Sequence, residues 1–261
     1  MASPVALWLA ALLLWPVLPS YAEPSAESVR DCVEANFPKH SSLQHIELRS
    51  VDRAGGTRVL AARLYWQRVG NYARAMIRVE APNELKNAAY LVIQPVGEVE
   101  RVYVYMPTMK KVRRITAKTA LNRLWGTDFS YEDMKFLQTA LNNVTVVLQG
   151  SGEISGRSTH VLETHLNVEA GSPYQRVVSH VDTASCVALR TEFFERGESP
   201  RKVLDADPSS LTRDGERWIA THFEMLDKNN QTRTMLTIEH REIDVELPDH
   251  LFSPKRLGEG R

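Results

Sequence analysis

The sequence carries no excess of either charge, because its 32 lysine and arginine residues match its 32 aspartate and glutamate residues. Without a global positive field, the chain does not attract nucleic acid over its whole surface, and we expect no nucleic-acid partner. It lacks a His-Glu-x-x-His motif and closely spaced cysteines, which argues against a zinc site. It also lacks a Gly-x-Ser-x-Gly elbow, a P-loop and a dinucleotide fingerprint. We therefore expect no metal, no cofactor and no enzymatic activity.

Cysteine is scarce, since the sequence holds only Cys32 and Cys186. In an oxidising compartment, an even pair far apart in sequence is a candidate disulfide. The alternative is two buried thiols. We favour the disulfide, because the N-terminal residues indicate export and free thiols are hazardous in such compartments.

Charged side chains are absent from residues 1–22. A short apolar run ends at Pro16 and small residues follow, which predicts a secretory signal peptide cleaved between Ala22 and Glu23. The alternative is a retained membrane anchor, but the run is short for a span that needs about 20 residues. No cysteine follows Ala22 directly, so we expect no lipid on the protein itself. From these features we expect export of a mature domain, residues 23–261.

A helix is predicted over residues 24–37. Its apolar stripe consists of Val29, Cys32, Val33 and Phe37, which are spaced as one face of a helix. Ser25 can cap the start, and Pro38 ends the helix. A disulfide from Cys32 would fix this helix against the strand predicted to begin at Cys186.

From about Leu43 onward the apolar residues recur with a period of two, the spacing of strands. Turn sequences lie between short strands, which predicts one antiparallel meander of about ten strands in a single domain. The strand over 99–106 is apolar on both faces, so we expect both faces to be covered. A sheet of this length curls, and it must cover its concave face or close up.

Helical sequence is limited to residues 24–37 and a segment around 119–141. Two short helices cannot fill the inside of a large curved sheet, so we expect an apolar cavity or groove. Its candidate lining residues are Ile77, Leu91, Ile93, Tyr103, Tyr105, Trp125, Phe129, Phe193, Phe223 and Met225. For any one of these positions, packing in the core is the more common role.

The stretch 107–134 concentrates charge. Its first part holds Lys110, Lys111, Arg113 and Arg114, and its second part holds Gly126, Thr127, Asp128, Tyr131, Glu132 and Asp133. Arg113 and Arg114 cannot both point the same way in a strand, so one of them should face the covered side and need a carboxylate partner. We expect ion pairs between the two parts to hold this stretch as a rim or lid. The alternatives are a solvated turn and an acid–base role for Asp128 or Glu132.

These residues carry a family resemblance. A signal peptide, an N-terminal helix and an antiparallel meander, with a strand followed by P-x-x-K-K-V-R-R-I and then G-T-D-F-S-Y-E-D-M, resemble the LolA-like outer-membrane lipoprotein-sorting protein family. The segment 247–253, LPDHLFS, resembles that family's C-terminal end. The resemblance implies a mainly β fold, an unclosed barrel with helices over its mouth and an apolar cavity for acyl chains.

The resemblance also implies a function. We expect a monomeric periplasmic carrier or chaperone for acyl chains of a lipid or an outer-membrane lipoprotein. The family often accompanies inner-membrane exporters of the RND/MMPL type, which are the expected protein partners. The alternative is a non-enzymatic regulatory or protein-docking module, because the same fold serves a periplasmic regulator of an envelope-stress anti-sigma factor.

Overall fold

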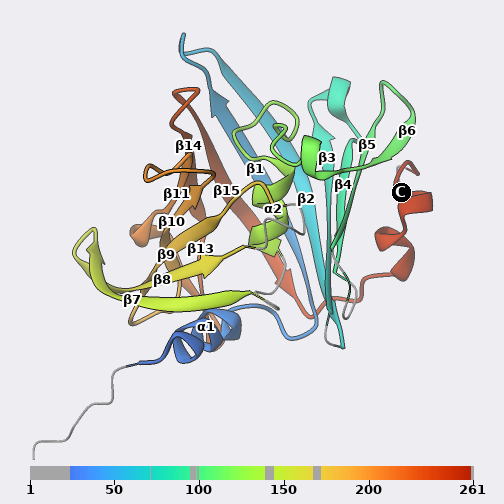
Figure 1. Cartoon of the computed structure of the whole chain (residues 1–261). Coiled ribbons are helices and arrows are strands. Elements are labelled where there is room, and N and C mark those ends of the chain that lie inside the picture. Colours follow the sequence, from blue (N-terminus) through green and yellow to red (C-terminus); the bar gives the residue numbers. More distant parts are fainter. Residues whose placement is uncertain are drawn as a thin grey trace, which may run out of the picture.

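A single antiparallel sheet of thirteen strands dominates the computed structural model, which describes residues 24–70, 72–94, 98, 100–138, 144–166 and 172–259 (Figure 1). In sheet order these strands are β6 (Lys111–Arg114), β5 (Arg101–Met106), β4 (Ala89–Ile93), β3 (Tyr72–Ala81), β2 (Thr57–Val69), β1 (Ser41–Val51), β15 (Thr232–Ile243), β14 (His222–Asp227), β11 (Lys202–Ala206), β10 (Ala188–Phe194), β9 (Arg176–Asp182), β8 (Arg157–His165) and β7 (Thr145–Ile154). A separate hairpin consists of β12 (Leu211–Asp214) and β13 (Arg217–Ala220).

The sheet curves without closing, because its two edges are β6 and β7 and these do not pair within the described residues. The first and last strands, β1 and β15, pair at its middle. The predicted mainly β, unclosed antiparallel barrel is therefore confirmed, although the strand order is not a simple meander. Because β6 and β7 are consecutive in sequence, the chain between them passes from one edge of the sheet to the other.

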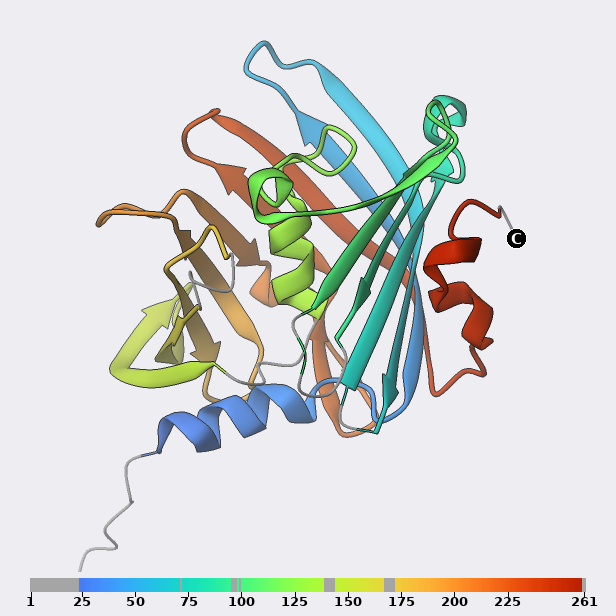
Figure 2. The ribbon, with the colours of Figure 1, turned by 45° about the vertical axis from the view of Figure 1, so that its right-hand side comes forward.

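Two α-helices accompany the sheet in the part of the chain that the structure describes. Helix α1 (Ala26–Ala35) begins at Ser25, whose side chain accepts a hydrogen bond from the amide of Ser28 at 3.1 Å, as predicted for an N-cap. Helix α1 contacts β7 and β8. Helix α2 (Tyr131–Gln138) lies inside the curve of the sheet, as Figure 2 shows. The short 3-10 helices are η1 (Asn83–Leu85), η2 (Ala117–Thr119), η3 (Pro208–Ser210), η4 (Asp249–Phe252) and η5 (Pro254–Arg256).

Apolar side chains cover both faces of the β3–β5 part of the sheet. The main core lies on the concave side, where Phe129 and Met134 pack against strand residues such as Ile77. A second cluster lies on the outer face, where Leu247, Phe252 and Leu257 of the C-terminal segment pack on Met76, Ala89 and Leu91. The C-terminal segment accordingly runs beside β3 to β5 in Figure 1. The expectation that both faces of the strand over 99–106 are covered is confirmed for β5, because Val102 packs in the main core and Tyr103 and Tyr105 pack in the outer cluster.

No helix in the described part of the chain has the length and apolar character needed to cross a membrane. The predicted signal peptide and its cleavage site between Ala22 and Glu23 lie outside the described residues.

Candidate functional site: an apolar cavity bordered by the N-terminal helix

A cavity of about 280 Å³ lies between the C-terminal end of α1, helix α2, the concave face of the sheet and the β12–β13 hairpin. It is open to solvent over part of its wall. Apolar side chains form most of the lining, and the large ones are Phe37, Leu64, Trp66, Phe129, Met134, Leu137, Leu204, Trp218, Ile219, Phe223, Leu236 and Ile238. A concave, mostly apolar site with few polar groups is the usual form of a small-ligand site.

Strand pairing places one wall of the cavity. Leu64 of β2, Gln44 of β1 and Arg241 of β15 are consecutive cross-strand neighbours and share the concave face. Two residues further along β2, Trp66 pairs with Ser42 of β1, and both also line the cavity. Alternation along a strand accounts for this, because residues two apart point to the same face.

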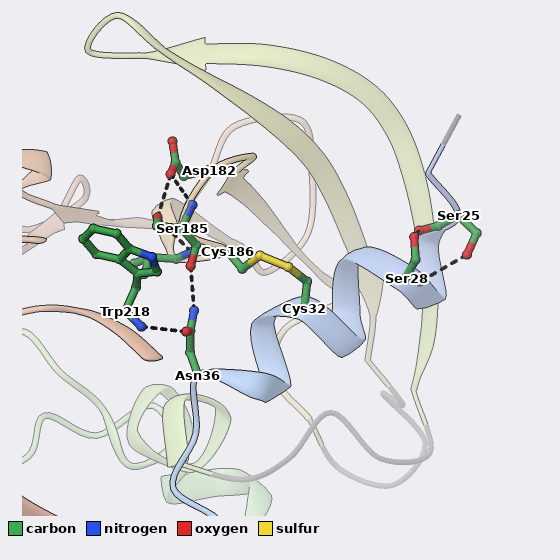
Figure 3. The surroundings of a disulfide bond; sticks show 9 residues. Ser25, Ser28, Cys32, Asn36, Asp182, Ser185, Cys186 and Trp218 are labelled. Carbon is green, nitrogen blue, oxygen red and sulfur yellow. Dashed lines mark hydrogen bonds between the residues drawn. A yellow bond between two sulfur atoms is a disulfide. The ribbon is translucent and has the colours of Figure 1, made fainter. Parts of the chain in front are cut away.

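The rim of the cavity is fixed by covalent and polar contacts (Figure 3). Cys32 of α1 and Cys186 form a disulfide with a Cα–Cα distance of 5.6 Å, which confirms the predicted pairing. The amide of Asn36 donates to the carbonyl of Ser185 at 2.8 Å, and its oxygen accepts from the backbone N–H of Trp218 at 2.8 Å. These contacts hold the end of α1 between a turn of the sheet and the β12–β13 hairpin.

Two details of the predicted disulfide are wrong. Cys32 is exposed and not part of the buried stripe, because helix α1 buries only Val29. Cys186 lies in the turn between β9 and β10 with a φ of 58°, not at the start of a strand. The disulfide therefore joins the helix to a turn beside the cavity mouth.

Three polar side chains that line the cavity have buried atoms without a hydrogen-bonding partner. They are the hydroxyl oxygen of Ser42, both amide atoms of Gln138, and Nε and Nη1 of Arg241. The pKa of Arg241 lies below the ordinary arginine value. Burial is the main cause, nearby Asp214 acts to raise the pKa, and nearby Arg217 acts to lower it. Asp214 lies 3.6 Å from Nη1 of Arg241, an ion pair too long for a hydrogen bond.

Of the ten candidate lining residues, the structure places Phe129 and Phe223 at this cavity. Four others, Ile77, Trp125, Phe193 and Met225, lie in the main core on the same side of the sheet but are not part of the cavity lining.

The remaining four candidates belong to the opposite face. Leu91, Ile93, Tyr103 and Tyr105 pack in the outer cluster under the C-terminal segment. Cross-strand pairing explains their placement, because Leu91 is opposite Met76 whereas Ile77 is opposite Tyr90. Leu91 therefore shares the face of Met76 and points away from Ile77. The expectation that these four line one interior with Ile77 is wrong.

The predicted ion pairs between the basic run 110–114 and the acidic part of the 107–134 stretch are also wrong. Lys110, Lys111, Arg113 and Arg114 are all exposed, because β6 is an edge strand and the run lies at its start and along it. The acidic residues find other partners. Asp128 accepts from Arg123 at 2.8 Å and from Thr234 at 2.7 Å, and Glu132 pairs with Lys135 at 2.8 Å.

The second part of that stretch forms a buried and well-bonded turn before α2. Asp133 accepts from Lys202 Nζ and the Tyr174 hydroxyl, each at 2.6 Å, and from the Ser130 amide at 2.7 Å. Lys202 also donates to the carbonyl of Asp128 at 2.8 Å. Because the buried carboxylate of Asp133 and the buried ammonium of Lys202 both have hydrogen-bonding partners within the protein, these residues form a structural network and not a reactive site.

Neighbouring residues complete this turn. Gly126 has a φ of 84°, a conformation that strains residues with a side chain, and a Cβ there would also approach the guanidinium of Arg58 to 3.2 Å. The hydroxyl of Thr127 donates to the carbonyl of Leu124 at 2.7 Å. Tyr131 stacks on Tyr90 with ring centroids 6.2 Å apart. Burial raises the pKa of Glu132, and nearby Lys135 partly lowers it. Among the described residues, no cluster of His, Cys, Asp and Glu could hold a metal ion.

Ser42, Gln138 and Arg241 were not predicted from the sequence as cavity residues, and for Arg241 the reason is a β-bulge. Strand β1 places Ile46 opposite Ile238 but His45 opposite His240, so Glu239 is an extra residue in β15. The bulge reverses the alternation, and Arg241 follows Ile238 onto the concave face. Simple alternation would have placed Arg241 on the outer face.

Comparison with solved structures identifies the fold. An outer membrane lipoprotein-sorting protein domain from Vibrio parahaemolyticus superposes with a TM-score of 0.80 at 19% identity, covering 90% of this chain and 98% of that chain. A DUF1329 family protein from Desulfovibrio piger gives 0.80 at 19% identity, covering 90% and 100%. A LolA superfamily protein from Nitrosomonas europaea gives 0.71 at 17% identity, covering 88% and 98%.

No curated protein matches the sequence. A family model described as "uncharacterized protein" matches residues 71–259, which is most of the chain. The chain therefore belongs to this family, and its fold is the LolA-like unclosed barrel of outer-membrane lipoprotein-sorting proteins.

Proposed function

We propose that the protein is a periplasmic carrier or chaperone that shelters an acyl chain of a lipid or outer-membrane lipoprotein in the cavity beside α1. The observation that carries this proposal is the apolar cavity of about 280 Å³, open to solvent, within a LolA-like barrel. Phe129 and Phe223 are the candidate lining residues that would contact the chain.

The size of the cavity sets the size of the ligand. An apolar cavity of about 150 Å³ accepts a benzene ring, so about 280 Å³ accommodates roughly ten carbons of a single chain. Each methylene removed from water contributes about 0.8 kcal/mol, which makes binding of such a chain favourable. One acyl chain, or the end of a longer one, is therefore the expected cargo.

Two measurements test the carrier function. Lipid mass spectrometry of protein purified from its native envelope without detergent should detect a bound acyl lipid, and a fluorescent acyl probe should bind the lipid-free protein. Leu137 lies on the cavity wall, so Leu137→Trp should fill the space and abolish probe binding. The matched control is Val59→Trp, since Val59 is exposed. Absence of both lipid and probe binding would contradict the proposal.

Export is part of the proposal. The N-terminal residues would direct the chain to the periplasm, with cleavage between Ala22 and Glu23 leaving a single domain, residues 23–261, without lipid on itself. N-terminal sequencing of the mature protein should begin at Glu23. Retention of residues 1–22 would favour a membrane anchor instead.

Docking of a protein partner is a second candidate function, favoured by the exposed edge strand β6. Its residues Lys111, Arg113 and Arg114 are all exposed, and an unpaired strand edge can recruit another chain. An inner-membrane RND/MMPL-type exporter is the proposed partner. Photo-crosslinking from position 113 in the envelope should capture it, whereas a crosslinker at exposed Val59 of the interior strand β2 should not.

A further inference from the structure

Three of the polar side chains that line the cavity, Ser42, Gln138 and Arg241, have unusual surroundings. Ser42 is 1% exposed and Gln138 is 5% exposed, and the side chain of Arg241 is 10% exposed. Each of the three nevertheless has side-chain atoms with no hydrogen-bonding partner in the protein. Buried polar groups are normally paired, so this arrangement points to a ligand that supplies the missing partners.

The three side chains come from one small region of the wall. Ser42 pairs with Ile243 across β1 and β15, which makes it the diagonal neighbour of Arg241 on the concave face, about 7–8 Å away. Ser42 also pairs with Trp66, whose indole N–H donates to the carbonyl of Gln138 at 2.8 Å. Strand pairing and this hydrogen bond thus bring all three residues to the same part of the cavity.

The charge in this region is positive and incompletely balanced. Asp214 is the acidic neighbour of Arg241, but it lies 3.6 Å away on the hairpin and is 38% exposed. The nearby Arg217 adds a second positive charge, although its Nε donates to the carbonyl of Phe37 at 3.1 Å. A guanidinium offers five N–H donors and suits the oxygens of carboxylates and phosphates.

We propose that the cavity selects a single-chain amphiphile with an anionic head group, which Arg241 binds through charge-assisted hydrogen bonds. The hydroxyl of Ser42 and the amide of Gln138 complete the contacts to the head-group oxygens, and the apolar remainder of the cavity holds the chain. This inference rests on the proposed carrier function and adds the chemical class of the ligand. A neutral head group would leave the buried guanidinium with only the partly exposed carboxylate of Asp214, 3.6 Å away, as a counter-charge.

Binding of three ten-carbon probes to the lipid-free mature protein tests the inference. The probes are decanoate, decyl phosphate and decanol, and the measurement is isothermal titration calorimetry. At least one anion should bind tenfold or more tightly than decanol, because hydrogen bonds to a buried cation are stronger than neutral ones. Whichever of decanoate and decyl phosphate binds more tightly shows whether the site prefers a carboxylate or a phosphate head group.

The variant Arg241→Gln separates head-group binding from chain binding. It should weaken the anion at least tenfold while decanol changes less than threefold. The matched control is Arg233→Gln, because Arg233 is on the same strand but 55% exposed, and it should leave all three affinities unchanged. Gln138→Leu is a second variant, expected to weaken the anion several-fold and to spare decanol, if Arg241→Gln does not fold.

Two outcomes would overturn the inference. The first is that decanol binds wild type as tightly as both anions, and the second is that Arg241→Gln weakens the binding of all three probes equally. Either result would show that Arg241 does not bind an anionic head group, and only the carrier function would stand. If none of the probes binds wild type, the carrier function fails as well.

Discussion

The ammonium nitrogen of Lys202 lies 2.6 Å from a carboxylate oxygen of Asp133, and both side chains are almost fully buried. Lys202 begins β11, whereas Asp133 is in the first turn of α2, 69 residues earlier. This pair therefore fixes α2 inside the curved sheet. Because Met134, Leu137 and Gln138 of α2 line the cavity, the pair also determines the shape of the binding site.

Replacement of Lys202 by methionine should destabilise the protein by about 3–5 kcal/mol, because it leaves the buried carboxylate of Asp133 without its cation. Urea unfolding would measure the free energy. The double variant Lys202→Met/Asp133→Asn should be less destabilised than the sum of the two single variants. As a control, Arg63→Ala removes an exposed pair with Glu80 and should cost at most about 1 kcal/mol. Additive single effects would contradict the coupling.

The sequence was informative where a local rule decides the structure. Ser25 caps α1 because its hydroxyl can accept from the helix amides, and the period of two identified the strands. The pairing of Cys32 with Cys186 followed from their number and the expected compartment. Each of these inferences needs only neighbouring residues or composition.

The sequence was uninformative where partners come from distant parts of the chain. Asp133 meets Lys202 across the sheet, and no spacing rule connects them. Tyr103 and Tyr105 look like interior residues until the C-terminal segment is seen to cover them. Arg241 faces the cavity because Glu239 forms a bulge, and a single extra residue reverses every later position in the strand.

Asp128 should be far more important for stability than the basic run that precedes it. Asp128→Ala removes a fully buried carboxylate that accepts from Arg123, Thr232 and Thr234, so we expect a loss of about 3 kcal/mol. Arg113→Ala should change stability by no more than about 0.5 kcal/mol, since that side chain is exposed. Thermal unfolding of both variants would compare them. Equal melting temperatures for Asp128→Ala and wild type would contradict the burial argument.

The disulfide should contribute strongly because it closes a long loop. Cys32 and Cys186 are 154 residues apart, and loop-closure entropy predicts a loss of about 4–5 kcal/mol for Cys32→Ser/Cys186→Ser. Reductant should lower the melting temperature of wild type toward that of the variant and leave the variant unchanged. Thiol titration of unfolded, unreduced wild type should find no free thiol. Detection of two thiols would show that the pair is not bridged in the native protein.

The pH dependence of stability should reveal the role of Asp182, which holds the turn that carries Cys186. Burial acts to raise the pKa of Asp182, but hydrogen bonds from Arg157 at 2.8 and 2.9 Å and from the hydroxyl and amide of Ser185 at 2.6 and 2.8 Å outweigh it. The net pKa lies below the ordinary aspartate value. A depressed pKa means that the folded state favours the charged carboxylate.

The sign of the effect follows from linkage. The stabilisation by Asp182 is fully present above the unfolded pKa of about 3.9 and is lost as the pH falls through the lower folded pKa. Asp182→Asn should therefore cost about 2 kcal/mol near neutral pH, and the difference from wild type should shrink as the pH drops below about 4. Glu132, whose pKa burial raises, acts in the opposite direction but is present in both proteins and cancels. Urea unfolding from pH 7 to pH 3 would measure the difference, with exposed Asp31→Asn as the control. A difference that stays constant across this range would show that Asp182 does not stabilise the turn through its charge.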